Sequence, residues 1–327
     1  MKNKFIFINL ILLTFFVSFK LFSQYDNVSF DHVSTDNNAF HFSVNSILQD
    51  KTGFLWFGTR VGLTIYDGKR FLTFRNSESD SSLSSELIRK IYESSNGDIW
   101  IGTANGINKY FYDKGYFKRY LINEKNKSLN VDIRGIIEDK SGYLWVATND
   151  GLKLYDSKKD TFITFYHSDN KPGTIQLNDI KSISLDKLGN IIIGYENLLL
   201  DYISLSGIDY SSLKDGFNIY HFSLGKDKKE KGSIIEIFID SKNQYWIGTN
   251  GSGVYKLNHN DFNFSVASKD KINQLGSKRI FTLKSQLSSP FIRDIIEDLN
   301  ENIWIATFGG GLNLYNTKTG EVNYFKN

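Results

Sequence analysis

The chain contains 327 residues, of which 15% are aromatic and none is cysteine. Without cysteine it can form neither a disulfide nor a thiolate metal site, and thiol catalysis is excluded. The formal charge of +3 comes from Lys2, Lys4 and Lys20 near the N-terminus, and the rest of the chain has as many basic residues as the 36 acidic ones. Such a neutral chain argues against a nucleic acid partner.

The first element along the chain is an N-terminal apolar run. Lys2 and Lys4 precede the apolar residues 5–17, and Ser23 is a small residue suited to cleavage. This pattern is typical of a secretory signal peptide, which we place at residues 1–23, and it predicts a periplasmic location. A membrane anchor is the alternative, but the run is short for a span and Lys20 follows it.

A sequence pattern recurs through the rest of the chain, first as GFLWFGTRVGLTIYDG from Gly53. A period of about 40 to 50 residues built from short strands is typical of propeller blades. Because a lone four-stranded sheet has two apolar faces, we expect the tryptophans to pack between neighbouring blades. Their column contains Trp56, Trp100, Trp145, Trp246 and Trp304, with Ile192 in this place in the fourth copy.

A turn precedes each tryptophan. Asp-x-x-Gly suits a type I turn, since the carboxylate accepts backbone N–H bonds and glycine tolerates positive φ. Glu301 replaces this glycine in the last copy, and we expect Asn300 to take the positive φ instead. Glu93, Glu138 and Glu297 before the turns are interpreted as ordinary strand residues. The turn column contains Asp50, Asp139, Asp186, Asp240 and Asp298, with Ser94 in the second copy.

Each copy predicts four antiparallel strands: an apolar run, the tryptophan strand, a third strand after a glycine turn, and a fourth. The expected fold class is therefore all-β, a β-propeller with six blade cores in one domain over residues 24–327. A truncated seven-bladed propeller is the alternative. The expected cores span residues 43–75, 87–121, 132–166, 179–223, 233–266 and 291–326.

Motifs for catalysis, metals and cofactors are missing from the sequence. The five histidines show no H-E-x-x-H spacing, and no G-x-x-x-x-G-K-[ST] or G-x-S-x-G motif occurs. The glycine clusters at Gly251 and Gly309 lie in turns between strands, so they do not cradle phosphate. We expect no catalytic residue, no metal and no cofactor.

One column near the start of each first strand carries candidate binding residues. It contains Asn45, Arg89, Arg134, Lys181, Ile235 and Arg293. First strands of a propeller are innermost, so these cations would surround one mouth of the axis and hold an acidic sugar or the hydroxyls of a neutral one. The alternative is that each arginine pairs with a carboxylate of the adjoining blade, for example near Glu138 or Glu297. The second turns at the same end add Arg60, Asn105, Asn149, Asp150, Asn250 and Phe308.

The repeated pattern D-x-x-G-x-[IL]-W-[IVF]-[GA]-T-x-x-G-[IL]-x-x-Y-D resembles the two-component regulator propeller repeat of periplasmic sensors in Bacteroidetes hybrid two-component systems. The resemblance covers residues 43–327. It implies a receptor for glycan fragments that regulates polysaccharide use. It also implies an inner-membrane protein in which further propeller, β-sandwich and histidine kinase regions follow, so the chain resembles an N-terminal fragment.

These observations predict a periplasmic, non-enzymatic sensor domain. Its expected partners are an oligosaccharide or other small polar ligand, the downstream regions of the sensor and a second copy in a homodimer. Two other function classes stay open. A propeller lyase or hydrolase acting on polysaccharide would place two carboxyls about 5 to 9.5 Å apart in a cleft, and a protein-interaction scaffold would expose a large apolar patch.

Overall fold

The computed structural model describes residues 28, 43–120, 130–210, 213, 216–225, 231–264, 267, 271–275, 278–281 and 287–326. The chain divides into two units, Met1–Phe40 and His41–Asn327, and the propeller belongs to the second. The signal peptide expected at residues 1–23 lies outside the described residues. In the described part of the chain, no helix has the length and apolar character needed to cross a membrane.

Six sheets follow one another along the chain, and each contains a group of four short antiparallel strands. The first blade contains β1 (Val44–Gln49), β2 (Leu55–Thr59), β3 (Gly62–Tyr66) and β4 (Phe71–Phe74). The second contains β5 (Ile88–Glu93), β6 (Ile99–Thr103), β7 (Gly106–Phe111) and β8 (Tyr116–Tyr120). The third contains β9 (Ile133–Glu138), β10 (Leu144–Thr148), β11 (Gly151–Asp156) and β12 (Thr161–Phe165).

The second half of the ring repeats this plan with two modified blades. The fourth blade contains β13 (Ser182–Leu185), β14 (Ile191–Gly194), β15 (Leu199–Ser204) and β16 (Asn218–Ser223), with the 3-10 helix η1 (Glu196–Leu198) before β15. The fifth contains β17 (Ser233–Ile239), β18 (Gln244–Asn250), β19 (Val254–Asn258) and β21 (Lys278–Phe281). The sixth contains β22 (Ile292–Glu297), β23 (Ile303–Thr307), β24 (Gly311–Tyr315) and β25 (Val322–Phe325).

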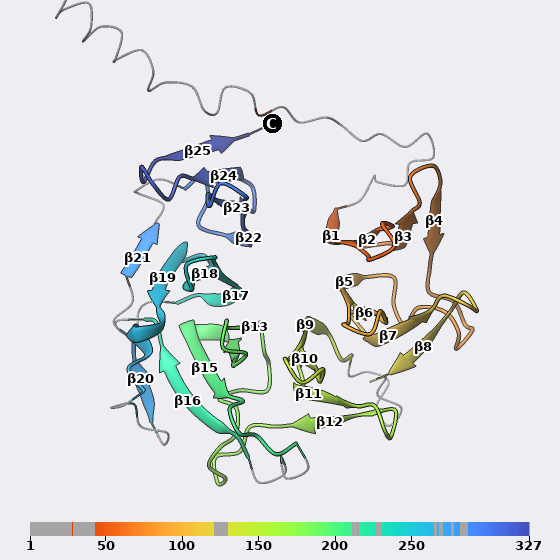
Figure 1. Cartoon of the computed structure of the whole chain (residues 1–327), viewed down its shortest axis with the longest axis horizontal. Helices are drawn as coiled ribbons and strands as arrows, with labels where there is room; N and C mark the ends of the chain where they lie inside the picture. Colours follow the sequence, from red (N-terminus) through yellow and green to blue (C-terminus); the bar gives the residue numbers. More distant parts are fainter. Residues whose placement is uncertain are drawn as a thin grey trace, which may run out of the picture. The chain divides into compact units, whose positions relative to one another are not determined.

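The six sheets are arranged as the blades of a β-propeller, which confirms the predicted fold class. The first strand of each blade lies nearest the axis and the fourth strand lies at the rim (Figure 1). First strands of consecutive blades contact each other from β1 through β22. Neighbouring strands of a blade run in opposite directions. The turns between first and second strands and the connections between third and fourth strands therefore lie on one face of the propeller, and the turns between second and third strands lie on the other.

The fifth blade reaches its fourth strand late. After β19 the chain forms η3 (His259–Phe262) and β20 (Ile272–Gln274). β20 pairs in parallel with β16 and so adds a fifth strand to the fourth blade. β21 thus lies beyond the 233–266 expected for the fifth blade core, because β20, which precedes it, joins the neighbouring sheet.

The turn aspartate binds the tryptophan as well as the turn. In the third blade Asp139 Oδ1 accepts hydrogen bonds from the N–H groups of Ser141 and Tyr143, and Oδ2 accepts from Trp145 Nε1 at 2.7 Å. The same indole bond forms at Asp50, Asp240 and Asp298. The sequence reasoning treated the aspartate as a turn residue only, whereas the structure explains why both residue types recur at a constant spacing.

One turn departs from the expectation. Glu301 itself has a φ of 66°, so the prediction that Asn300 takes the positive φ was wrong. Glu301 has the same position in its hairpin as Gly142 in the third blade, where φ is 81°, so the hairpin register imposes a positive φ on both residues. Lys242 Nζ of the fifth blade lies 2.8 Å from Glu301 Oε2 and anchors the strained residue.

Neighbouring blades are joined by two recurring contacts. An added Cβ on Gly102 would lie 2.5 Å from Ile133 Cγ2 of the next blade, so the glycine before the threonine allows close approach. Glu138 accepts hydrogen bonds from the Ser95 N–H and hydroxyl on the turn of the preceding blade, and Glu297 does the same for Ser241. These glutamates join blades, and the interpretation of them as ordinary strand residues was incomplete.

The tryptophans form the packing between blades. Trp56 contacts Tyr110 and Tyr112 of the second blade at ring distances of 5.4 and 5.8 Å. Four of the indoles are at most 2% exposed, whereas Trp304 of the last blade is only partly buried. The first blade also has an uncovered face. Ile47 is 63% exposed, whereas Ile91, at the same position in the second blade, is 7% exposed.

Candidate functional site

The predicted basic column lies at the start of the innermost strands. Arg89 lies on β5, Arg134 on β9 and Arg293 on β22, while Lys181 directly precedes β13. Strand direction brings these residues to the face that carries the turns between second and third strands. We call this set of strand starts and turns the mouth.

Two of the arginines share one carboxylate. Arg89 donates from Nε to Asp132 Oδ1 at 2.9 Å and from an Nη to Asp132 Oδ2 at 3.1 Å, and Arg134 approaches Asp132 Oδ2 at 3.1 Å. Asp132 belongs to the connection that enters the third blade and is itself buried. Its backbone N–H donates to Asn149 Oδ1 at 2.8 Å, so a second-turn residue holds the carboxylate in place.

Lys181 is also paired. Its Nζ lies 2.6 Å from Asp179 and 3.1 Å from Glu196. Burial alone would lower the pKa of Lys181, but the hydrogen bonds to the two carboxylates raise this pKa above its ordinary value. Arg89, Arg134 and Lys181 therefore have carboxylate partners. Of these three, Arg89 pairs with a carboxylate at the adjoining blade, as the alternative interpretation predicts, although that carboxylate is Asp132 and not Glu138 or Glu297.

Arg293 has a different environment. Its guanidinium carbon lies 4.8 Å from the ring centroid of Phe308, which is 64% exposed. The pair comes from β22 and from the second-to-third turn of the same blade, and it presents a cation on an aromatic face at the mouth.

The remaining predicted residues lie at the mouth, and all except Ile235 have a polar side chain. Asn45 donates from Nδ2 to the carbonyl of Ile88 at 2.9 Å, and Asn149 donates to the carbonyl of Asn130 at 3.1 Å. Asp150 accepts from Lys153 Nζ and from Tyr166. The others are Arg60 and Asn250, which are exposed, and Asn105 and Ile235, which are partly buried.

Two buried atoms at the mouth keep unused hydrogen-bonding capacity within the described residues. They are the donor Arg134 Nε and the acceptor Asp179 Oδ1. A buried polar atom without a partner costs about 1 to 3 kcal/mol, so each of these two atoms lowers the stability of the mouth.

A further charged group on the first strands was missed by the sequence reasoning. The register shifts between Ile88 and Lys90, between Ile234 and Glu236, and between Ile292 and Asp294. In each bulge, two residues of the first strand lie opposite one residue of the second strand. The residue after the basic column therefore also lies on the axis-facing side of the first strand. The missed residues are Lys90, Glu236 and Asp294. The sequence could have indicated them, because a charged residue recurs directly after the basic column.

Burial raises the pKa of Glu236 to about 7, Lys90 opposes the shift and Asp294 adds to it. Since this value exceeds the ordinary 4.5, the folded protein binds more protons than the unfolded chain between about pH 4.5 and 7. Stability therefore falls as the pH rises through that window. We expect Glu236→Gln to stabilise the protein at pH 8 by about 1 to 3 kcal/mol and to have no effect at pH 4.

Urea unfolding at the two pH values measures this difference, and Glu321→Gln at an exposed turn is the matched control. The raised pKa would be contradicted if Glu236→Gln and the original chain had the same free energy of unfolding at both pH values.

Three comparisons place the chain among known proteins. The family model described as "Two component regulator propeller" matches residues 43–60, 82–105 and 127–150. Histidine kinase P4 of Formosa agariphila is 38% identical over 72 residues, which are 22% of this chain and 5% of that protein. The chain therefore matches only a small part of this relative's length.

Two solved structures are similar to this chain, and one of them supports the fold. A catalytically inactive virginiamycin B lyase from Staphylococcus aureus is 12% identical with a TM-score of 0.61, over 87% of this chain and 84% of that one. The extracellular domain of a protein assigned as the hybrid two component system BT3049 of B. thetaiotaomicron is 24% identical with a TM-score of 0.49, over 83% of this chain and 39% of that one. The first shows a shared propeller fold at low identity. Three segments of this chain, one for each of its first three blades, match the two-component regulator propeller repeat.

Proposed function

We propose that the chain is the ligand-sensing propeller of a hybrid two-component sensor and that it binds a glycan fragment in the periplasm. The propeller repeats and the similarity to a histidine kinase support the sensor role. On this proposal a kinase in the same protein responds to the ligand, and the ligand acts by binding one arrangement of the sensor more tightly than another.

The observation that carries the ligand class is the pairing of charges at the mouth. A polyanion would have to displace Asp132 from Arg89 and Arg134, and Asp179 and Glu196 from Lys181. A neutral sugar carries no charge that competes for these carboxylates, so it can bind at the mouth without breaking an ion pair. The Arg293–Phe308 pair adds an aromatic face for a sugar ring. The paired charges thus favour a neutral oligosaccharide over an acidic one.

Calorimetric titration with matched neutral and sulfated oligosaccharides tests this site. We expect the double variant Arg134→Ala, Arg293→Ala to bind the neutral series at least about tenfold more weakly, a loss of about 1.4 kcal/mol. Arg70→Ala is the control, because Arg70 lies on a third-to-fourth turn on the other face and its side chain is 88% exposed. Undiminished affinity in the double variant would discard the mouth as the binding site.

One observation favours a second candidate, an enzyme that cleaves polysaccharide. Glu236 has a pKa of about 7 and Asp294 of the next blade influences it, and a raised carboxyl pKa beside a second carboxylate is typical of glycosidases. The discriminating measurement is release of new reducing or unsaturated ends from polysaccharide. Activity that disappears in Glu236→Gln would replace the sensor-only proposal for this domain.

A further inference from the structure

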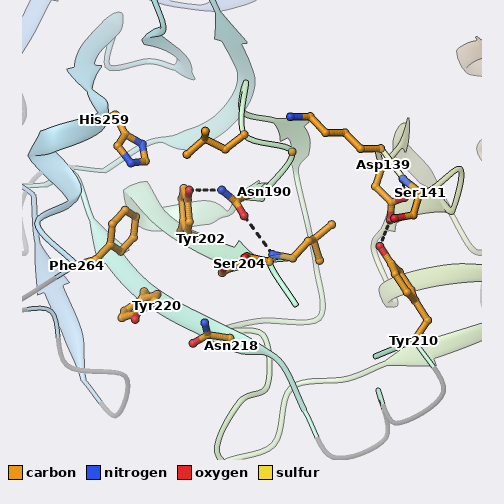
Figure 2. Close-up of a pocket in the computed structure, with 15 residues that line it drawn as sticks. Asp139, Ser141, Asn190, Tyr202, Ser204, Tyr210, Asn218, Tyr220, His259 and Phe264 are labelled. Atoms are coloured by element: carbon orange, nitrogen blue, oxygen red, sulfur yellow. Dashed lines mark hydrogen bonds between the residues drawn. The ribbon is translucent and has the colours of Figure 1, made fainter. Parts of the chain in front are cut away.

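A cavity lies on the propeller face opposite the mouth, between the third, fourth and fifth blades. Its volume is about 610 Å³, within the range of small-molecule sites. The first-to-second turns of the third and fourth blades contribute Asp139, Ser141 and Asn190, and the end of β15 contributes Tyr202 and Ser204 (Figure 2). Strand direction separates this cavity from the basic column, so it is a second place at which a ligand can bind.

The fourth repeat, which lacks its tryptophan, contributes Tyr202 and Asn190 to this cavity. Ile192 is in the indole position, and Tyr202 takes over the bond to the turn by donating to Asp186 Oδ2 at 2.7 Å. Asn190 Nδ2 lies 2.6 Å from the hydroxyl of Tyr202, and Asn190 Oδ1 accepts from the N–H of Leu205 at 3.1 Å. The substitution therefore brings a tyrosine and an asparagine to the face where the other blades bury an indole.

A long connection forms the opposite wall. Between β15 and β16 the chain carries Tyr210 to the third blade, where its hydroxyl donates to Asp139 Oδ2 at 2.7 Å. The ring of Tyr210 stacks on Tyr143 with centroids 3.8 Å apart and planes 10° apart. These contacts attach Tyr210 to the third blade, and Tyr210 lines the cavity beside Asp139 and Ser141 (Figure 2).

The fifth blade supplies the third wall. Phe264 lies after η3 and contacts Tyr202 and Tyr220 at ring distances of 4.5 and 5.1 Å. His259 lines the same side, and the hydroxyl of Tyr245 lies 3.0 Å from its Nδ1. Aromatic rings from two blades thus face a cavity whose other side carries amide and hydroxyl groups (Figure 2).

This lining fits one class of ligand. Aromatic faces pack against the apolar face of a ring, while Asn218, Ser204 and Ser206 can donate to and accept from hydroxyls at its edge. Asp139 already accepts bonds from the turn, from Trp145 and from Tyr210, so it is committed to the fold. We propose that this cavity binds a pyranose ring of a neutral sugar, as a second site that is independent of the mouth.

Saturation-transfer NMR on the whole chain tests the proposal with three probes: methyl β-D-glucopyranoside, methyl β-D-galactopyranoside and methyl α-D-mannopyranoside. We expect transfer to the ring protons of at least one glycoside. Asn218→Ala and Tyr220→Ala should each weaken that binding at least about fivefold, because they remove an edge contact and an aromatic wall. Tyr324→Ala, at an exposed tyrosine of the sixth blade, is the matched control.

The design separates this site from the mouth. Asn218 is exposed at the start of β16, so its replacement tests the site even if Tyr220→Ala unfolds. The mouth double variant Arg134→Ala, Arg293→Ala should keep full glycoside binding. Absence of transfer from all three glycosides, unchanged binding in Asn218→Ala, or loss of binding in the mouth variant would each overturn the proposal.

Discussion

Replacing Trp145 with alanine is expected to lower the free energy of unfolding by about 3 to 5 kcal/mol, whereas the same change at Trp304 should cost about 1 to 2 kcal/mol. Trp145 is fully buried and contacts Phe165 in its own blade and Phe217 in the next, each at 6.0 Å. Trp304 is partly buried, with a ring contact to Phe325 of its own blade at 5.7 Å. The removed indole therefore leaves a closed cavity only in the first case.

Urea unfolding followed by circular dichroism measures both losses, and the Trp304→Ala variant is the internal control for loss of an indole. If both variants lost the same free energy of unfolding, burial between blades would not explain how much each tryptophan contributes to stability.

Asp139→Ala is expected to lower the free energy of unfolding by about 3 to 5 kcal/mol, because buried donors lose a shared acceptor. The carboxylate accepts from Trp145 Nε1 and from the Tyr210 hydroxyl, each at 2.7 Å, and from two backbone N–H groups of the turn. Alanine leaves the indole N–H buried without a partner. Thermal and urea unfolding of the variant measure the loss.

The second blade provides the matched comparison, since Ser94 replaces the aspartate there. Ser94 bonds locally, to Asn96 and to the carbonyl of Asp98, so we expect Ser94→Ala to cost about 1 kcal/mol. A loss at Asp139 no larger than the loss at Ser94 would contradict the role of the carboxylate as a link between turn and indole.

A protein-interaction scaffold would expose a large apolar patch, and apolar side chains are exposed on the first and sixth blades. Ile47 of the first blade and Ile296 of the sixth are 63% and 54% exposed, and the turn residue Leu299 is fully exposed. In the inner blades the counterparts of Ile47 are covered by a neighbouring blade, as Ile91 and Ile136 show at 7% each. The exposure follows from the position of these blades at the two ends of the row.

The repeat pattern was sufficient to predict the blades. Strand alternation, the Asp-x-x-Gly turn and the spacing of the tryptophans act within one copy, and local geometry decides them. Six four-stranded sheets with innermost first strands were therefore predictable before any coordinates. The glycine that admits an isoleucine of the next blade belongs to the same local pattern, although its reason lies in the neighbouring sheet.

Partners between blades could not be predicted in this way. Arg89 reaches Asp132 across 43 positions of sequence, and Tyr210 reaches Asp139 across 71. The bulges that bring Lys90, Glu236 and Asp294 to the innermost strands depend on sheet register, and the cavity of the fourth blade depends on a connection crossing to the third. The sequence alone thus determined the repeated unit, because its turns and strand pattern are local. The tertiary structure decided which charges are neutralised and where a cavity forms, because those contacts join different copies of the unit.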